Sequence, residues 1–139
     1  MTSAEQRLDS MNDYVDAWQQ RDAAAVRACF APDGTYVNPA VPHGIAGDAI
    51  TEMVAASLAG FSDLRFEIVM ALTAEPDCGL MQWVMHGTND GPAAPGLDAT
   101  GKKVALPGCN VFRFGPDGIV RCDVYFDQTT FAAQLGLNG

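Results

Sequence analysis

A phenol and a carboxamide stand two residues apart in this sequence, at Tyr36 and Asn38, directly before Pro39. A side-chain amide donates and accepts hydrogen bonds, but it does not take up a proton at neutral pH. The pair can therefore hold a substrate or a water molecule in place, whereas it cannot act as a general base. We expect Asn38 to orient a bound molecule and Tyr36 to contact it.

Two further hydrogen-bond donors, Tyr14 and Asn110, suit the stabilisation of negative charge. A buried phenol is a strong neutral donor that can stabilise an oxyanion, and a carboxamide N–H can also donate a hydrogen bond. Tyr14 could equally be a helix tyrosine that fills the core and binds backbone. The sequence leaves both interpretations open.

Proton transfer needs a titratable group, and His86 is the first candidate. His86 and His43 are the two histidines of the chain, and imidazole has an ordinary pKa near neutrality. Strand alternation places His86 on the face opposite to Trp83 and Met85, which favours an outward position. His86 would serve as a proton shuttle only if it turned inward.

Asp123 is the second candidate for proton transfer. It shares one face of the last strand with Arg121 and Tyr125, while Val124 and Phe126 share the other face. We expect the apolar set to face the cavity. Asp123 is therefore either a general acid or base reached by a different register, or one half of a surface ion pair with Arg121.

Bulky apolar residues predict the wall of a pocket for a small, flat, hydrophobic molecule. The same side chains would also make an ordinary core, and only polar groups that converge on them distinguish a pocket from a core. The expected lining is Trp18, Tyr36, Phe61, Phe66, Trp83, Met85, Phe112, Val124 and Phe126.

The composition indicates one globular domain over residues 1–139. Seventeen acidic against eight basic residues give a net charge of −9, which opposes binding to nucleic acid and anionic lipid. No apolar run approaches the roughly 20 residues of a membrane span, and the first residues do not resemble a signal peptide. We expect a cytoplasmic protein whose partner is a small hydrophobic molecule.

The four cysteines, Cys29, Cys78, Cys109 and Cys122, form no C-x-x-C pair and have no histidine at ligand spacing. They are expected to be reduced, buried thiols. We therefore expect neither a metal site nor a cofactor.

Hydrophobic periodicity predicts helices in the first part of the chain and strands in the second. In the first helix, Leu8, Met11, Val15 and Trp18 recur at helical spacing. The expected helices are Ala4–Gln20, Ala23–Phe30, Asp48–Leu58 and a closing turn over Gln128–Leu135 capped by Asp127. The expected strands are Tyr36–Asn38, Leu64–Leu72, Gly79–Thr88, Lys102–Phe114 and Ile119–Asp127, with a mobile loop or lid at residues 90–96.

This order of elements predicts an α+β domain. Helices followed by a meander of long strands favour a cone-shaped, curved antiparallel β-sheet, with the N-terminal helices closing an apolar pocket. The hairpin at Gly115–Gly118 joins the last two strands and supports this arrangement.

Several stretches together carry a family resemblance. They are Tyr14–Trp18, Arg21–Asp22, Phe30–Pro39, Gly47–Ile50, Thr100–Lys102, Gly118–Val120, Tyr125–Asp127 and Gln134–Gly136. The chain resembles the SnoaL-like branch of the nuclear transport factor 2-like superfamily, which includes polyketide cyclases, ketosteroid isomerases and limonene epoxide hydrolases. The resemblance implies a cone around an apolar cavity, a reaction without a cofactor, and a homodimer formed through the outer face of the sheet.

The resemblance also bears on single residues. Tyr14 lies where the isomerases have their oxyanion-binding tyrosine, Asn110 lies near their second donor, and Asn38 replaces their general-base aspartate. The resemblance therefore implies that Tyr14 and Asn110 could polarise a substrate carbonyl. Tyr36-x-Asn38 matches the water-holding motif of the epoxide hydrolases, but the positions of their Asp-Arg-Asp set correspond to Met85, Gly87 and Val124. The acid of the SnoaL-like cyclases has its nearest counterpart in Asp123.

These features favour a cofactor-independent cyclase or isomerase that acts on a small hydrophobic polyketide-, steroid- or terpenoid-like carbonyl compound. One alternative is a non-catalytic module that binds a small hydrophobic ligand. Others are an epoxide hydrolase-like enzyme with a rearranged site and a dimerisation domain whose cavity is vestigial. Function in such a fold is decided by the site and not by the fold itself.

Overall fold

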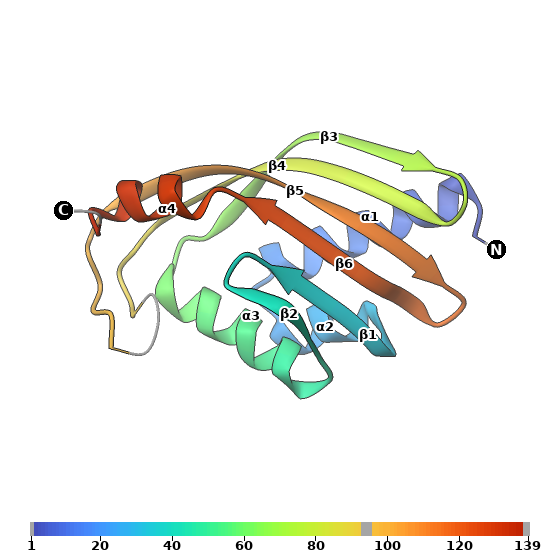
Figure 1. Cartoon of the computed structure of the whole chain (residues 1–139), viewed down its shortest axis with the longest axis horizontal. Helices are drawn as coiled ribbons and strands as arrows, with labels where there is room; N and C mark the ends of the chain where they lie inside the picture. The colour runs from blue at the N-terminus through green and yellow to red at the C-terminus, as the bar shows by residue number, and fades with distance from the viewer. Residues whose placement is uncertain (1, 93–95, 138–139) are drawn as a thin grey trace.

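The computed structural model describes residues 2–92 and 96–137, and Figure 1 shows the arrangement of its elements. Within these described residues, four helices and six strands follow one another in the order α1 (Ala4–Gln19), α2 (Ala23–Ala28), β1 (Phe30–Asn38), β2 (Val41–Ala46), α3 (Asp48–Gly60), β3 (Arg65–Ala74), β4 (Cys78–Thr88), β5 (Lys103–Gly115), β6 (Gly118–Phe126) and α4 (Gln128–Leu135). Most predicted boundaries agree with these bounds within two residues. None of the described helices is long and apolar enough to cross a membrane.

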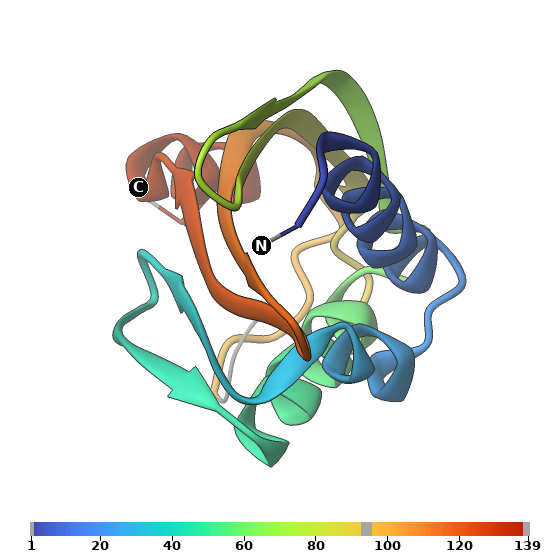
Figure 2. The ribbon, with the colours of Figure 1, turned by 90° about the vertical axis from the view of Figure 1, so that its right-hand side faces the viewer.

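The strands form one curved sheet in the order β2-β1-β6-β5-β4-β3. Figure 2 shows the sheet curling around one side of the molecule, while α1, α2 and α3 lie on the other side. The predicted α+β cone is confirmed. One strand pair differs from the expected antiparallel pattern, because β1 runs parallel to β6. The chain between them passes through α3 and the whole meander.

Strand β2 is an element that the sequence did not predict. Its composition, with Pro42 and Gly44, is that of a loop, but it pairs antiparallel with β1 at the edge of the sheet. Proline is tolerated in an edge strand because no ladder hydrogen bond is lost there. The amide of Asn38 makes the pairing possible, since its Oδ1 accepts hydrogen bonds from the backbone N–H groups of Ala40 and Val41 at 2.8 and 3.0 Å.

Helix α1 buries a stripe that is turned by one residue from the expected one. Ser3 caps its first turn in a capping box with Gln6. Met11 and Trp18 are buried as predicted, but Leu8 is 40% exposed and Arg7 is 1% exposed. A charged residue thus occupies the buried position at the start of the helix.

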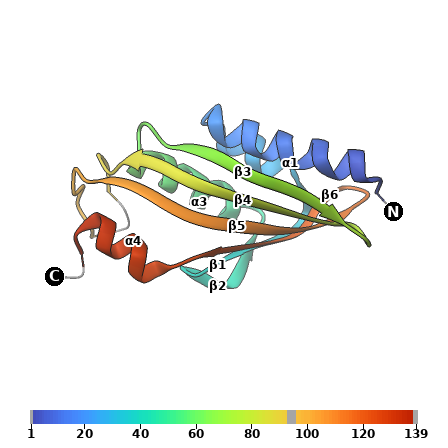
Figure 3. The same cartoon turned by 90° about the horizontal axis from the view of Figure 1, so that it is seen from above.

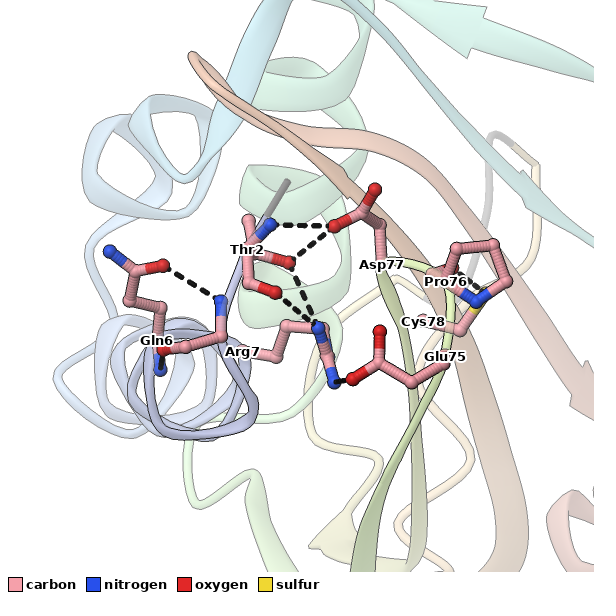
Figure 4. A network of polar contacts seen from close by, with 8 residues as sticks. Thr2, Gln6, Arg7, Glu75, Pro76, Asp77 and Cys78 are labelled. Carbon is pink, nitrogen blue, oxygen red and sulfur yellow. Dashed lines mark hydrogen bonds and ion pairs between the residues drawn. The ribbon is translucent and has the colours of Figure 1, made fainter.

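The guanidinium of Arg7 is held by groups on two sides (Figure 4). Nη1 donates to the backbone oxygen of Thr2 at 2.6 Å, and Nη2 lies 3.0 Å from Oε1 of Glu75 at the end of β3. Asp77, in the turn after β3, accepts from the backbone N–H and hydroxyl of Thr2 at 2.7 and 2.8 Å. The network fastens the start of α1 to the β3–β4 turn, which explains why Arg7 is turned inward in place of Leu8.

Two glutamine side chains cover strand edges in the way a neighbouring strand would. The amide of Gln19 accepts from the backbone N–H of Phe66 at 3.0 Å and donates to its carbonyl at 3.1 Å. Gln134 makes the same pair of bonds with Ala105, at 2.9 and 3.0 Å. Figure 3 shows α1 running beside β3 and α4 lying at the opposite end of the molecule. Each helix thereby closes part of a sheet edge.

The connection from β4 to β5 is anchored by Asn89, which is fully buried. Its Nδ2 donates to the carbonyls of Gly60 and Gly91 at 3.0 and 2.9 Å, and its Oδ1 accepts from the backbone N–H and the hydroxyl of Thr100, each at 2.9 Å. The amide therefore joins the end of α3 to both ends of this connection. The predicted mobile loop, residues 90–96, includes residues 93–95, which lie outside the described residues.

The substitution Asn89→Ala is expected to lower the free energy of unfolding by about 3 kcal/mol, because it leaves buried carbonyls and the Thr100 donors without a partner. Urea denaturation measures the change. The matched control Asn12→Ala, at an exposed position of α1, should stay within about 0.5 kcal/mol of the original protein. A loss as small as that of the control would show that water replaces the amide.

Candidate functional site

A cavity of about 350 Å³ lies between the sheet and helices α1, α3 and α4. Its wall is mostly apolar, with side chains from α1, α3, α4 and all six strands. Eight of the nine residues predicted to line a pocket lie on this wall: Trp18, Tyr36, Phe61, Phe66, Trp83, Met85, Val124 and Phe126. Three polar residues expected from the sequence, Tyr14, Asn38 and Asn110, reach the same wall.

Phe112 is the predicted lining residue that does not reach the cavity wall. It is fully buried, and its ring packs edge-on against Tyr14 at a centroid distance of 5.3 Å and stacks with Phe114 at 5.7 Å. On β5, Leu106 and Asn110 meet the cavity, and Phe112 lies two residues beyond Asn110 along the same face, beneath α1. Phe112 thus supports Tyr14 from below.

Asn38 is fixed by its surroundings in one orientation. Its Oδ1 binds the N–H groups of Ala40 and Val41, so its Nδ2 points to the hydroxyl of Tyr36 at 3.1 Å. A backbone N–H can only donate, which settles which amide atom is the oxygen. Because the Tyr36 oxygen accepts from Asn38, the Tyr36 proton is free to be donated into the cavity. A carboxylate at position 38 could not make this bond to Tyr36.

Asn110 is also held in one orientation. The indole N–H of Trp83 donates to Oδ1 of Asn110 at 2.9 Å, and the two residues are only 5% and 3% exposed. They come from adjacent strands, β4 and β5. The carbonyl end of the amide is therefore occupied, and the N–H end is left for a molecule in the cavity.

Tyr14 lies on the same wall and is 3% exposed. Burial raises the pKa of Tyr14 well above its usual value, and the nearby Cys122 and Tyr36 add to the shift. The pKa of Tyr36 is also raised, mainly by burial and further by Cys122. Both phenols therefore stay protonated near neutral pH and act as neutral donors.

His86 and Asp123 are not brought to the cavity. Nε2 of His86 lies 2.9 Å from Oε1 of Glu67, on the outer face of the sheet. Nε of Arg121 lies 2.9 Å from Oδ2 of Asp123 on that same outer face. The physical reason is strand alternation, which turns Met85 and Val124 inward and these neighbours outward. The expected apolar face of the last strand is the one that meets the cavity.

The described cavity wall holds no carboxylate and no imidazole. Met85 and Val124, at two of the three positions that an epoxide hydrolase of this fold would need for its acids and arginine, are part of the wall. Among the described residues there is also no group of three or more His, Cys, Asp or Glu side chains arranged to hold a metal ion. The chemistry of this site is hydrogen-bond donation in an apolar setting.

Sequence reasoning missed several residues of the cavity wall, among them Met53, Met81, Leu106 and Phe131, and it also missed an arginine that braces one end of the site. Phe131 of α4 lines the cavity, stacks on Phe61 at 6.2 Å and packs edge-on against Phe126 at 5.9 Å. Arg21 reaches from the α1–α2 turn to the end of α3, where it donates to the carbonyls of Phe61 and Leu58 at 2.9 and 2.6 Å. The apolar spacing of the closing helix could have indicated Phe131, whereas nothing local indicates the reach of Arg21.

The curved sheet, the helices that close it and the internal cavity give the chain a ketosteroid isomerase-like fold. More specifically, residues 11–122 match the family model described as the SnoaL-like domain. The chain therefore belongs to the SnoaL-like domain family. No protein of curated function matches it significantly.

Solved structures with the same fold cover nearly the whole chain. TsrD from Streptomyces laurentii is 18% identical with a TM-score of 0.84, over 99% of each chain. A proposed SnoaL-like polyketide cyclase from Jannaschia sp. CCS1 is 16% identical with a TM-score of 0.84, over 100% of this chain and 99% of the other. A ketosteroid isomerase-like protein from Catenulispora acidiphila, solved with trimethylamine, is 24% identical with a TM-score of 0.76, over 93% of each chain.

The buried phenols predict a loss of stability in alkali. Burial raises the pKa values of Tyr14 and Tyr36 above those of the unfolded chain, so the unfolded chain releases these protons first, near pH ~10. The free energy of unfolding should therefore fall as the pH rises through this value. Urea denaturation between pH 8 and about 11 measures the fall, and Tyr36→Phe should make it shallower. An identical slope in that variant would contradict the assignment.

Proposed function

We propose that this chain is a cofactor-independent enzyme of the cyclase or isomerase type, acting on a small hydrophobic carbonyl compound of polyketide-, steroid- or terpenoid-like character. The observation that carries the proposal is the convergence of three neutral donors, Tyr14, Tyr36 and Asn110, on one apolar cavity of about 350 Å³. Membership of the SnoaL-like family supports the same reaction class.

The donors would act on the oxygen where negative charge develops. When a carbon beside a carbonyl loses a proton, the charge moves to the carbonyl oxygen, and fixed donors in an apolar site stabilise it more strongly than water does. Tyr14 and Asn110 would bind this oxygen, and Tyr36 would bind the same or a neighbouring one. Asn38 would act through Tyr36, by holding its hydroxyl in place.

The lack of a carboxylate or imidazole on the described wall limits which substrates could react. The titratable groups on the described wall are the two phenols, which stay protonated. The carbon acid must therefore be one that water can deprotonate with help from the donors, such as a carbon between two carbonyls. Its electron pair can then form a C–C bond to a third carbonyl carbon, whose oxygen takes a proton from water. Such an intramolecular aldol closure consumes no net proton and needs no cofactor.

Exchange of the acidic methylene protons of 1-phenylbutane-1,3-dione for deuterium, followed by NMR, tests this proposal. The protein should accelerate the exchange, and Tyr14→Phe and Asn110→Ala should each reduce the acceleration by about tenfold to a hundredfold. Tyr125→Phe, which changes an exposed phenol on the outer face, is the matched control. Unchanged rates in both cavity variants would remove the proposed site.

The second candidate function is a non-catalytic module that binds a small hydrophobic ligand. The observation in its favour is the same lack of a carboxylate or imidazole on the described wall. The exchange experiment separates the two functions. A diketone that binds in the cavity but exchanges no faster than in buffer identifies a binding module.

We also propose that the chain forms a homodimer through the outer face of the sheet. That face carries Met70, Leu72 and Tyr125, which are 41%, 51% and 57% exposed. Exposed apolar side chains gathered on one face are typical of protein interfaces. The three come from two strands that are not neighbours, β3 and β6, so they spread over the width of the sheet.

Light scattering after size-exclusion chromatography should give about twice the chain mass of 14.7 kDa. Leu72→Glu combined with Tyr125→Glu is expected to give the monomer, because it places charges in the apolar contact. Leu8→Glu, on the exposed side of α1, is the control and should leave the mass unchanged. A monomeric mass for the original protein would contradict the proposal.

A further inference from the structure

The hydrogen bond between Trp83 and Asn110 determines whether the amide oxygen or the amide nitrogen of Asn110 faces the cavity. An indole N–H can only donate, so the atom that it binds must be the oxygen of the Asn110 amide. The amide nitrogen is then the end that remains for the cavity. This orientation follows from donor chemistry and from the 2.9 Å distance between the two atoms.

The amide nitrogen of Asn110 is open to the cavity. In the described part of the chain it has no hydrogen-bond partner, and the one fully enclosed side-chain atom without a partner there is Nε of Arg7. Asn110 itself is 3% exposed and lies on the cavity wall. Its N–H groups are therefore unpaired and face the interior space, where a ligand oxygen could accept from them.

Trp83 can reach Asn110 because of the residue beside it. Gly108 is paired with Trp83 across β4 and β5, and a side chain at Gly108 would overlap the indole ring. The ring therefore lies across β5 towards Asn110. Phe66 packs edge-on against the indole, at a centroid distance of 5.2 Å. The indole is thus held between the backbone of Gly108 and the ring of Phe66.

We propose that Trp83 is the positioning residue that sets the specificity of this cavity: by occupying the oxygen of Asn110, it makes the site select ligands with an acceptor oxygen. Asn38 is treated in the same way, since its oxygen is taken by Ala40 and Val41. Both amides on the wall therefore have their oxygens bound, and the free polar group at each of these two places is an N–H or, through Tyr36, an O–H. This inference rests on the proposed function in one respect, namely that the cavity is the ligand site.

Two probes of matched shape, 2-acetylnaphthalene and 2-ethylnaphthalene, test the inference. The ketone has an acceptor oxygen and the hydrocarbon has none. The ratio of their dissociation constants therefore measures the preference of the cavity for a ligand with an acceptor oxygen. Trp83→Phe keeps an aromatic ring but removes the N–H. It should reduce the preference for the ketone by roughly three- to tenfold, because the amide of Asn110 is no longer held with its nitrogen inward.

A carbonyl stretch measured by infrared spectroscopy gives a readout that a loss of packing would not move. The stretch of bound 2-acetylnaphthalene should lie at higher wavenumber in Trp83→Phe than in the original protein, because its hydrogen bond is weakened. Phe114→Leu removes an aromatic ring from the core away from the cavity wall. It should lower thermal stability without changing either the preference or the carbonyl stretch.

A double variant shows whether Trp83 acts through Asn110. Adding Trp83→Phe to Asn110→Ala should change the preference no further than Asn110→Ala alone. If Trp83→Phe does not fold, the side-chain amide signal of Asn110 in the original protein should move with the ketone and not with the hydrocarbon. A preference unaffected by Trp83→Phe, or an amide signal indifferent to the ketone, overturns the inference alone. Failure of both probes to bind the original protein overturns the proposed function as well.

Discussion

A polar group that leaves water must find a partner inside the protein, and this requirement shapes the molecule from its core to its cavity. Asn89 meets it with four hydrogen bonds that join the end of α3 to the β4–β5 connection. Asn38 meets it with two backbone N–H groups, and the turn formed there starts an additional strand. Asn110 meets it with one indole N–H. Each partner satisfies one buried polar atom of an amide and thereby fixes where the other polar atom of that amide points.

The unpaired ends of these side chains determine which hydrogen-bonding groups face the cavity. Its wall is apolar apart from a few groups, and the two amides and the Tyr36 phenol present hydrogens to the interior. The Ser57 hydroxyl on the same wall donates its proton to the carbonyl of Met53 instead. Such a wall is suited to stabilising negative charge on oxygen, and its described residues include no carboxylate or imidazole that could remove a proton at neutral pH. The amide of Asn38 binds two backbone N–H groups and the hydroxyl of Tyr36, so it holds the turn and orients the phenol. In the proposed reaction, the ligand itself must therefore carry a C–H group acidic enough for water to deprotonate.

The part of this picture that depends on local patterns could be predicted from the sequence. Alternation in β4 and β6 correctly separated Met85 and Val124 from His86 and Asp123, because the two faces of a strand exchange at every residue. The helix pattern was less decisive. Leu8 and Arg7 differ by one position, and only the distant Glu75 and Thr2 explain why Arg7 is the buried one.

The features that escaped prediction depend on partners remote in sequence. Strand β2 has the composition of a loop and becomes a strand because Asn38 turns the chain back. The parallel pairing of β1 with β6 joins segments separated by most of the chain. The orientation of each amide could not be foreseen either, because it depends on which donor lies opposite. Sequence therefore indicates which residues line the cavity but not which of their atoms face it.

The glutamines that cover the strand edges have a consequence for misfolding. An uncovered edge strand is a template on which other chains can assemble into aggregates. Gln19 protects β3 only while α1 is docked, and beyond Phe66 that strand continues into an apolar run that ends at Leu72. Detachment of α1 would expose the apolar side chains of this run and the unpaired backbone groups of the strand edge to solvent. The docking of α1 therefore protects the folded chain from aggregation through the edge of β3.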